Sequence, residues 1–142
     1  MIKYVKGDLF LAPLTQLLVH AVNCQGMWGS GIAKQFNRKY RVEYYLYQAF
    51  CKYSPKPLTG QSVILNNIGC LFTSDNYGAL VDPPELILKS TQLALEDLLS
   101  KTTMDIAMPK INSGLFKVPW EQTAEIIEKV SGQRNIFVYT NE

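Results

Sequence analysis

Three glycines lie close together after an apolar segment, in the string Asn23-Cys24-Gln25-Gly26-Met27-Trp28-Gly29-Ser30-Gly31-Ile32. Glycine lets the backbone approach a ligand closely, and the N–H groups at the start of a helix favour an anion, usually a phosphate. The string has neither the lysine of a Walker phosphate loop nor the spacing of the dinucleotide fingerprint. From the glycines alone, a phosphate-binding loop and a tight turn that binds nothing are equally well supported.

A second loop of small residues favours the phosphate interpretation. The string Lys110-Ile111-Asn112-Ser113-Gly114-Leu115-Phe116 follows an apolar run and precedes a helix start at Pro119-Trp120-Glu121. Two loops that direct backbone donors to one end of a sheet suit a diphosphate better than a monophosphate. An ordinary loop is the alternative, and for Phe116 and Trp120 the alternative to stacking on a ligand is burial in the core.

Two further polar residues follow apolar runs. The Asp8 carboxylate can accept a hydrogen bond from an adenine amino group, or it can cap a short turn. The Asn23 amide donates and accepts hydrogen bonds together, which suits sugar hydroxyls better than phosphate. Ligands of open α/β sheets bind beyond the carboxyl ends of the strands, so we expect these residues and both loops to share one cleft.

Short apolar runs alternate with amphipathic segments along the chain. The runs predict strands at residues 2–5, 17–23, 63–65, 68–72, 106–108 and 136–139. A tight turn at Asn66-Asn67 joins the third and fourth strands as a hairpin, which makes the sheet mixed rather than wholly parallel. Strands that alternate with helices predict an α/β three-layer sandwich, here one domain over residues 1–142.

Four helices are predicted from apolar residues at helical spacing. The first follows Gly31, and the third begins with Asp82 as the capping acceptor and proline in its first turn. The fourth covers residues 119–130 and ends at Gly132. The predicted buried stripe of the first helix is Ile32, Phe36 and Tyr40. The stripe of the second helix is Val42, Tyr45, Leu46, Ala49 and Phe50. The stripe of the third helix is Ile87, Thr91, Ala94, Leu95 and Leu98.

Composition excludes several classes of protein. The 142 residues carry a formal charge of +2, too small to predict a non-specific nucleic-acid binder, and no aromatic–basic alternation is visible. The basic residues Lys34, Arg38, Lys39 and Arg41 are either a solvated helix face or a means of steering an anionic ligand. No apolar run approaches the roughly 20 residues that span a bilayer. Three scattered cysteines and one histidine support neither a disulfide framework nor a zinc site. We therefore expect a reduced, metal-free protein of the cytoplasm, with a nuclear location as the alternative.

Several strings together resemble the macrodomain superfamily, and within it the chain is most similar to the small fungal-type ADP-ribose 1″-phosphate phosphatases. The resemblance covers essentially the whole chain. The strings are Gly7-Asp8-Leu9-Phe10, residues 22–33, Leu71-Phe72-Thr73-Ser74, residues 108–120 and Phe137-Val138-Tyr139.

The resemblance implies a mixed six-stranded sheet with a cleft for ADP-ribose. It implies that Asp8 contacts adenine with Leu9 beside it, that Asn23 meets the distal ribose, and that Tyr139 and Asn141 lie near the adenosine. The residues that it implies around the diphosphate are Gly29, Ser30, Gly31 and Ile32 on one side, and Asn112, Ser113, Gly114, Leu115 and Phe116 on the other.

Catalytic candidates are Asn23, His20 and Asp75. His20 is the only residue with an unperturbed pKa near neutrality, although a buried core histidine is the alternative; Asp75 is either an acid–base group near the distal ribose or a solvated turn residue. Cys24 has no second histidine to activate it as a nucleophile. Macrodomains that remove ADP-ribose from glutamate use a lysine that is missing from Thr73-Ser74-Asp75-Asn76 and an aspartate where this chain has Phe116.

The expected function is therefore hydrolysis of the phosphate of ADP-ribose 1″-phosphate, without a cofactor. The alternatives are a mono-ADP-ribosyl or O-acyl-ADP-ribose hydrolase and a binding module without catalysis. The expected partners are ADP-ribose or its derivatives, with ADP-ribosylated macromolecules as a further class; we expect a monomer with no membrane contact.

Overall fold

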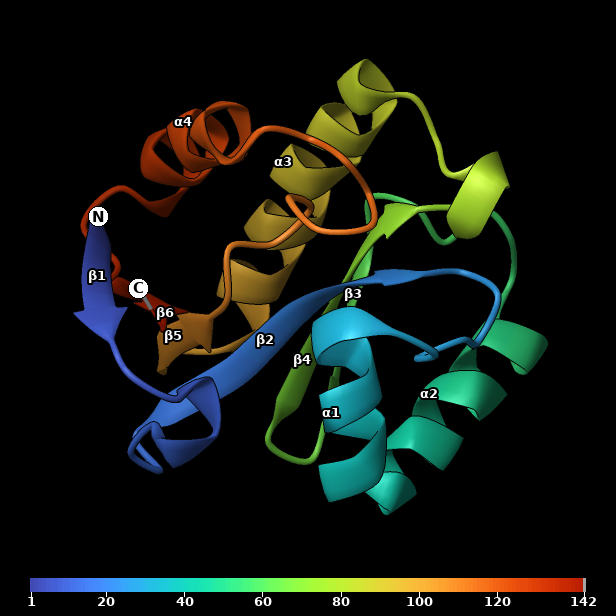
Figure 1. Ribbon diagram of the computed structural model, residues 1–142, viewed down its shortest axis with the longest axis horizontal. Helices are drawn as coiled ribbons and strands as arrows, with labels where there is room; N and C mark the ends of the chain where they lie inside the picture. The colour runs from blue at the N-terminus through green and yellow to red at the C-terminus, as the bar shows by residue number, and fades with distance from the viewer. Residues whose placement is uncertain (142) are drawn as a thin grey trace.

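The computed structural model describes residues 1–141 and contains a mixed sheet of six strands (Figure 1). Its spatial order is β1-β6-β5-β2-β4-β3, and all neighbouring strands are parallel except β3, which runs antiparallel to β4 at one edge. The six-stranded mixed sheet predicted from the sequence is confirmed. The strands are β1 (Ile2–Lys6), β2 (Gln16–Asn23), β3 (Ser62–Leu65), β4 (Ile68–Ser74), β5 (Asp105–Met108) and β6 (Ile136–Thr140).

Helices cover both faces of the sheet and so form the predicted three layers (Figure 1). One layer consists of α1 (Gly31–Lys39) and α2 (Arg41–Tyr53), and the other of α3 (Pro84–Lys101) and α4 (Trp120–Ser131). Two 3-10 turns, η1 (Leu9–Leu11) and η2 (Gly78–Leu80), follow β1 and β4. No helix of residues 1–141 is long and apolar enough to cross a membrane.

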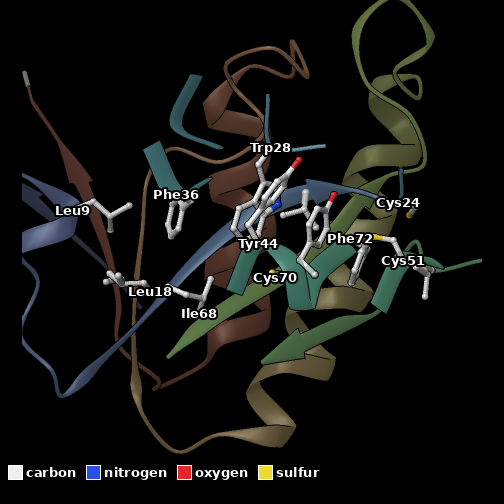
Figure 2. Packing of buried hydrophobic residues seen from close by; sticks show 14 residues of the cluster. Leu9, Leu18, Cys24, Trp28, Phe36, Tyr44, Cys51, Ile68, Cys70 and Phe72 are labelled. Atoms are coloured by element: carbon white, nitrogen blue, oxygen red, sulfur yellow. The ribbon is translucent and has the colours of Figure 1, made fainter. Parts of the chain in front are cut away.

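Side chains of β2 alternate between two hydrophobic cores, as a strand with both faces covered requires. Leu18 and Val22 pack with α1 and α2, whereas Leu17 and Val19 pack with α3 and α4. The first of these cores is rich in aromatic rings, and Figure 2 shows Trp28, Phe36, Tyr44 and Phe72 among its members. This aromatic core lies beneath the first glycine loop, which contributes Trp28.

Most element boundaries agree with the sequence, and several local signals are confirmed. Asn66 has a positive φ of 55° at the β3–β4 turn, and Gly132 ends α4 with a φ of 56°. The predicted stripe of α3 is buried throughout. The single domain over residues 1–142 stays a prediction, and its last residue, Glu142, lies outside the described residues.

Two predictions about helices are wrong. In α2 the buried residues are Tyr44, Tyr47 and Cys51, while four of the five members of the predicted stripe are exposed: Val42, Tyr45, Leu46 and Ala49. Helix α2 is apolar on two sides, so periodicity alone could not decide which side packs on the sheet.

Asp82 does not cap α3. The N-cap position is occupied by Pro83, whose side chain makes no capping hydrogen bond. The Asp82 carboxylate instead accepts a hydrogen bond from the backbone N of Asp75 at 3.0 Å, and the Asp82 backbone N donates to Ser74 Oγ at 3.0 Å. Asp82 therefore ties the two ends of the loop that follows β4.

Candidate functional site

A cleft of about 1060 Å³ lies beyond the carboxyl ends of β2, β4 and β5. The first glycine loop borders it on one side and the second loop on another, with residues of η2 also in its wall. Its size reaches the upper end of the range of small-molecule sites, about 1,000 Å³. The predicted site residues that line it are His20, Asn23, Gly29, Ser30, Gly31, Ile32, Asn112, Ser113, Gly114, Leu115 and Phe116.

A second, smaller hollow of about 130 Å³ adjoins this cleft. Ile32 and Pro109 line both spaces, so the hollow and the cleft are neighbours. The remaining predicted binding residues lie in the smaller hollow: Asp8, Leu9, Tyr139 and Asn141. The structure thus brings together every residue predicted to bind the ligand.

The first glycine loop is tied down by Asn23, which is 5% exposed. Its Nδ2 donates to the Met27 carbonyl at 2.8 Å, and its Oδ1 accepts from the backbone N of Gln25 at 2.9 Å. The Tyr47 hydroxyl of α2 lies 2.5 Å from the Asn23 carbonyl oxygen and 3.1 Å from its Oδ1. Among the described residues, Asn23 Nδ2 has Met27 as its one acceptor, so this side chain holds the loop and still has one N–H to offer.

The same loop leaves a run of backbone donors unused. Gly31 begins α1 with a φ of +60°, and the Ser30 side chain makes no capping bond to the helix. Within residues 1–141, the backbone N–H groups of residues 28–33 have no hydrogen-bond acceptor. These donors lie at the N-terminus of α1, which is the positive end of the helix dipole. Both the free N–H groups and the dipole favour an anion at this loop.

The second loop is anchored through the buried side chain of Asn112. Its Oδ1 accepts from Thr73 Oγ1 at 2.9 Å, and its Nδ2 lies 2.9 Å from Thr91 Oγ1 and 3.4 Å from Thr123 Oγ1. Three elements, β4, α3 and α4, thus hold one amide. Asn112 acts as an anchor of the loop, and its side chain is fully engaged inside the protein.

Beyond Asn112 this loop also presents free donors. The N–H groups of residues 113–116 have no acceptor among the described residues, whereas the N–H groups of Lys117 and Val118 donate to Gly114 and Asn112. A Cβ added at Gly114 would meet no atom within 4 Å. Two separate stretches of unused N–H groups therefore line one cleft.

His20 is fully buried, although it is one of the residues that line the cleft. Its ring stacks on Phe36 with 3.9 Å between centroids and meets Trp28 edge-on at 4.7 Å. Neither ring nitrogen has a partner in the described residues. Burial lowers the pKa of His20 to about 3, so the ring is neutral near pH 7, which favours the core interpretation over a general acid.

Asp75 is exposed and lines neither space. Its backbone carbonyl accepts from Cys24 N and from Gln25 Nε2, both at 3.1 Å, so the Asp75 backbone braces the first loop. Its role in catalysis stays a prediction. Burial raises the pKa of Cys24 to about 12, so that thiol stays protonated, in agreement with its exclusion as a nucleophile.

Sequence reasoning missed several residues of the wall. Tyr77, Gly78 and Ala79 come from the loop after β4, in and beside η2. Lys110 and Lys117 flank the second loop and are the two basic residues of the main cleft. Lys117 has a φ of 62°, a conformation that its residue type does not signal.

Comparisons with known proteins agree with this geometry. Residues 19–127 match the family model described as Macro domain. An ADP-ribose 1″-phosphate phosphatase of Chaetomium globosum is 37% identical, over 86% of this chain and 80% of its own length. A protein of the same name from Debaryomyces hansenii is 33% identical, over 97% of this chain and 99% of its own.

Solved structures show the same fold. The macrodomain of Thermus aquaticus DarG superposes with a TM-score of 0.81 at 22% identity, covering 99% of this chain and 98% of the other. Thermosipho africanus DarTG in complex with ADP-ribose gives a TM-score of 0.78 at 17% identity, covering 97% of this chain and 41% of the other.

Proposed function

The chain belongs to the Macro domain family, and from this premise we propose that it binds ADP-ribose 1″-phosphate and hydrolyses it to ADP-ribose and phosphate. One observation of the structure carries the proposal. Residues 28–33 and 113–116 present two stretches of unused backbone N–H groups to the same cleft. A diphosphate is the ligand that such a pair of donor stretches suits.

The smaller hollow supports the adenosine end of the ligand. The Asp8 side chain uses Oδ1 to accept from the Phe10 N–H at 2.9 Å, which leaves Oδ2 for an adenine amino group. Tyr139 donates its hydroxyl to Gln16 Oε1 at 2.8 Å, so its ring is fixed beside the hollow. We therefore assign both roles that the sequence left open to Asp8, with Oδ1 for the turn and Oδ2 for adenine.

The reaction needs water to attack phosphorus, the bond between phosphorus and the C1″ oxygen to break, and that oxygen to take up a proton. No Asp or Glu lines the main cleft in the described chain. We therefore assign most of the rate to positioning and to charge stabilisation by the loop N–H groups with Lys110 and Lys117. The free N–H of Asn23 is assigned to the distal ribose.

Phosphate release from ADP-ribose 1″-phosphate by the purified protein tests the proposal, with calorimetric binding of ADP-ribose measured in parallel. We expect binding and release. Ser30→Ala removes a cleft hydroxyl that makes no cap bond and is expected to slow release. Ser100→Ala, far along α3, is the matched control and keeps the full rate. No release above that of a buffer blank contradicts the assigned reaction.

The lack of a carboxylate in the main cleft also favours a second function, a module that binds ADP-ribose without turning it over. Asp75→Asn separates the two, because the Asp75 carboxylate makes no hydrogen bond within residues 1–141. If Asp75 is an acid–base group, this variant loses release and keeps binding. Binding without release by the unmodified protein favours the module, or a hydrolase of another ADP-ribosyl or acyl bond.

We also propose that the protein works as a monomer in the cytoplasm, on free ADP-ribose derivatives or on ADP-ribosylated macromolecules. Its three cysteines are buried and unpaired, which fits a reducing compartment. Light scattering of the purified protein tests the oligomeric state.

A further inference from the structure

The two helical layers carry opposite net charges. Helices α1 and α2 together hold five basic residues and one acidic residue, a net charge of +4. Helices α3 and α4 hold three basic and six acidic residues, a net charge of −3. The chain as a whole carries only +2. This net charge is small because a basic helical layer on one face of the sheet is largely offset by an acidic layer on the other.

The outer face of α2 is apolar and aromatic as well as basic. Val42, Tyr45, Leu46 and Tyr53 are 62%, 58%, 43% and 76% exposed. Val42, Tyr45 and Leu46 belong to the stripe that the sequence predicts to be buried, and Tyr53 is the last residue of the helix. A helix face that exposes large side chains in a row, rimmed by charge, is typical of an interaction site.

Cations lie over the two most exposed rings of this face. The Arg41 guanidinium lies 5.1 Å from the ring centroid of Tyr45 and donates to its hydroxyl at 2.9 Å. Lys52 Nζ lies 5.2 Å from the ring centroid of Tyr53. The two tyrosines are eight residues apart, about 12 Å along the helix at 1.5 Å per residue.

We propose that this face, the α1–α2 surface formed by Arg38, Arg41, Lys52, Tyr45 and Tyr53, binds single-stranded nucleic acid. Such ligands are held by cations that neutralise phosphates together with aromatic rings on which bases stack. The surface offers both groups side by side. Its separation of about 12 Å between rings corresponds to three or four nucleotides of a stacked strand at 3.4 Å each.

Other occupants fit the surface less well. A second copy of the chain that places α2 against α2 would bring two layers of net +4 together, which like-charge repulsion opposes. An acidic protein segment would satisfy the cations, but it has no flat groups to stack on the two tyrosine rings.

The α1–α2 surface and the cleft share helix α1. Gly31, Ile32 and Ala33 begin α1 and line the cleft, and Lys34 and Arg38 follow on the same helix. A strand held along the layer would therefore lie close to a site whose proposed ligand is itself a nucleotide. No aromatic–basic alternation is visible in the sequence, because Arg41, Tyr45, Lys52 and Tyr53 are spaced along α2 and come to one face only when the segment is helical.

Fluorescence anisotropy with a labelled 12-nucleotide oligo-dT and an oligo-rA of equal length tests the proposal. The assay contains no ADP-ribose derivative, so its outcome is independent of the phosphatase assignment. With about three phosphates neutralised, by Arg38, Arg41 and Lys52, the slope of log affinity against log salt is about −2 for a single strand. Raising salt from 50 to 200 mM is thus expected to weaken binding about 20-fold.

Matched variants locate the surface. Arg38→Gln combined with Lys52→Gln is expected to weaken binding about tenfold at 50 mM salt and to reduce the salt slope by about 1.4. The control, Lys89→Gln combined with Lys129→Gln, removes the same charge from exposed positions of α3 and α4 and leaves binding unchanged. Neither pair lines the cleft, so phosphate release stays constant in both.

The role of stacking is tested at Tyr53, whose ring is largely exposed. Tyr53→Ala is expected to weaken binding about fivefold or more, and Tyr53→Phe to restore it. Thermal melts identify any variant that loses its fold. The proposal is overturned if neither oligonucleotide binds at 50 mM salt, if the control pair weakens binding as much as the α1–α2 pair, or if poly-glutamate of equal charge competes as well as oligo-dT.

Discussion

The two loops that line the cleft differ in the buried polar groups that support them: within residues 1–141, those under the first loop lack hydrogen-bond partners, and those under the second have them. Beneath the first loop, His20 and the Trp28 indole are buried with no partner for either His20 nitrogen or for Trp28 Nε1 in the described chain. Beneath the second loop, the Asn112 amide is bonded to hydroxyls of Thr73, Thr91 and Thr123. The support of the first loop, His20 and Trp28, relies on aromatic packing, and the support of the second loop, Asn112 with its threonines, relies on hydrogen bonds. Acid and mutation should therefore affect the first support and the second support differently.

The largest expected effect is the acid sensitivity of the first support. The pKa of His20 is about 3 in the folded protein because of burial, against an ordinary value of 6.5. Below pH 6.5 the unfolded chain binds a proton that the folded protein excludes, so stability is complete above pH 6.5 and is lost as the pH falls towards 3. The loss grows by up to about 1.4 kcal/mol per pH unit, or about 4 to 5 kcal/mol in all.

Urea unfolding at pH values from 7 to 4 measures this loss. His20→Phe retains an aromatic ring against Phe36 and removes the titrating group. The difference between the two proteins isolates His20 from the carboxylates that titrate in the same range. Parallel pH curves for both proteins would mean that His20 is hydrated or partnered in solution.

The second support is expected to fail through loss of its hydrogen bonds. Asn112→Ala leaves the hydroxyls of Thr73 and Thr123 without their buried partner and places alanine at a φ of 65°. The expected cost is about 3 kcal/mol of unfolding free energy, because buried polar groups lose their partners and the left-handed backbone favours Asn. Urea unfolding at pH 7 measures it, and a cost below about 1 kcal/mol contradicts the anchoring role.

A third change is expected to weaken ligand binding and to leave the buried groups under both loops unchanged. Gly114→Val adds a side chain where a Cβ meets nothing within 4 Å and where φ is not positive, so folding is expected to be unaffected. The branched side chain occupies cleft space beside the free N–H groups of residues 113–116. ADP-ribose affinity should fall about 100-fold, which is about 2.7 kcal/mol.

Calorimetry measures that affinity, with Gly114→Ala as the graded control that adds a single methyl group. Full affinity in the valine variant would mean that the second loop does not contact the ligand.

The sequence predicted the loops better than their supports. Glycines and small polar residues at strand ends mark Gly29–Ile32 and Ser113–Phe116 directly, and all of these residues line the cleft. The pairing of Asn112 with three threonines could not be predicted, since those threonines lie on β4, α3 and α4 and meet only in the folded chain. For the same reason the sequence could not predict which side of α2 packs on the sheet. Tyr44 and Tyr47 are buried there, and Val42 and Leu46 are exposed, because the two tyrosine hydroxyls bond the first loop.

The smallest expected effect compares the two tyrosines of α2 that reach this loop. The Tyr47 hydroxyl donates to the Asn23 carbonyl at 2.5 Å and also lies 3.1 Å from Asn23 Oδ1. The Gly26 carbonyl, in contrast, accepts from both Tyr44 at 3.3 Å and Gln48 Nε2 at 3.1 Å. Tyr47→Phe should therefore cost about 1 kcal/mol of stability and lower ADP-ribose affinity severalfold by loosening Asn23, while Tyr44→Phe costs about half as much or less. Urea unfolding and calorimetry on both variants measure the difference, and equal effects would mean that packing of the rings, and not the hydroxyl on Asn23, holds the first loop in place.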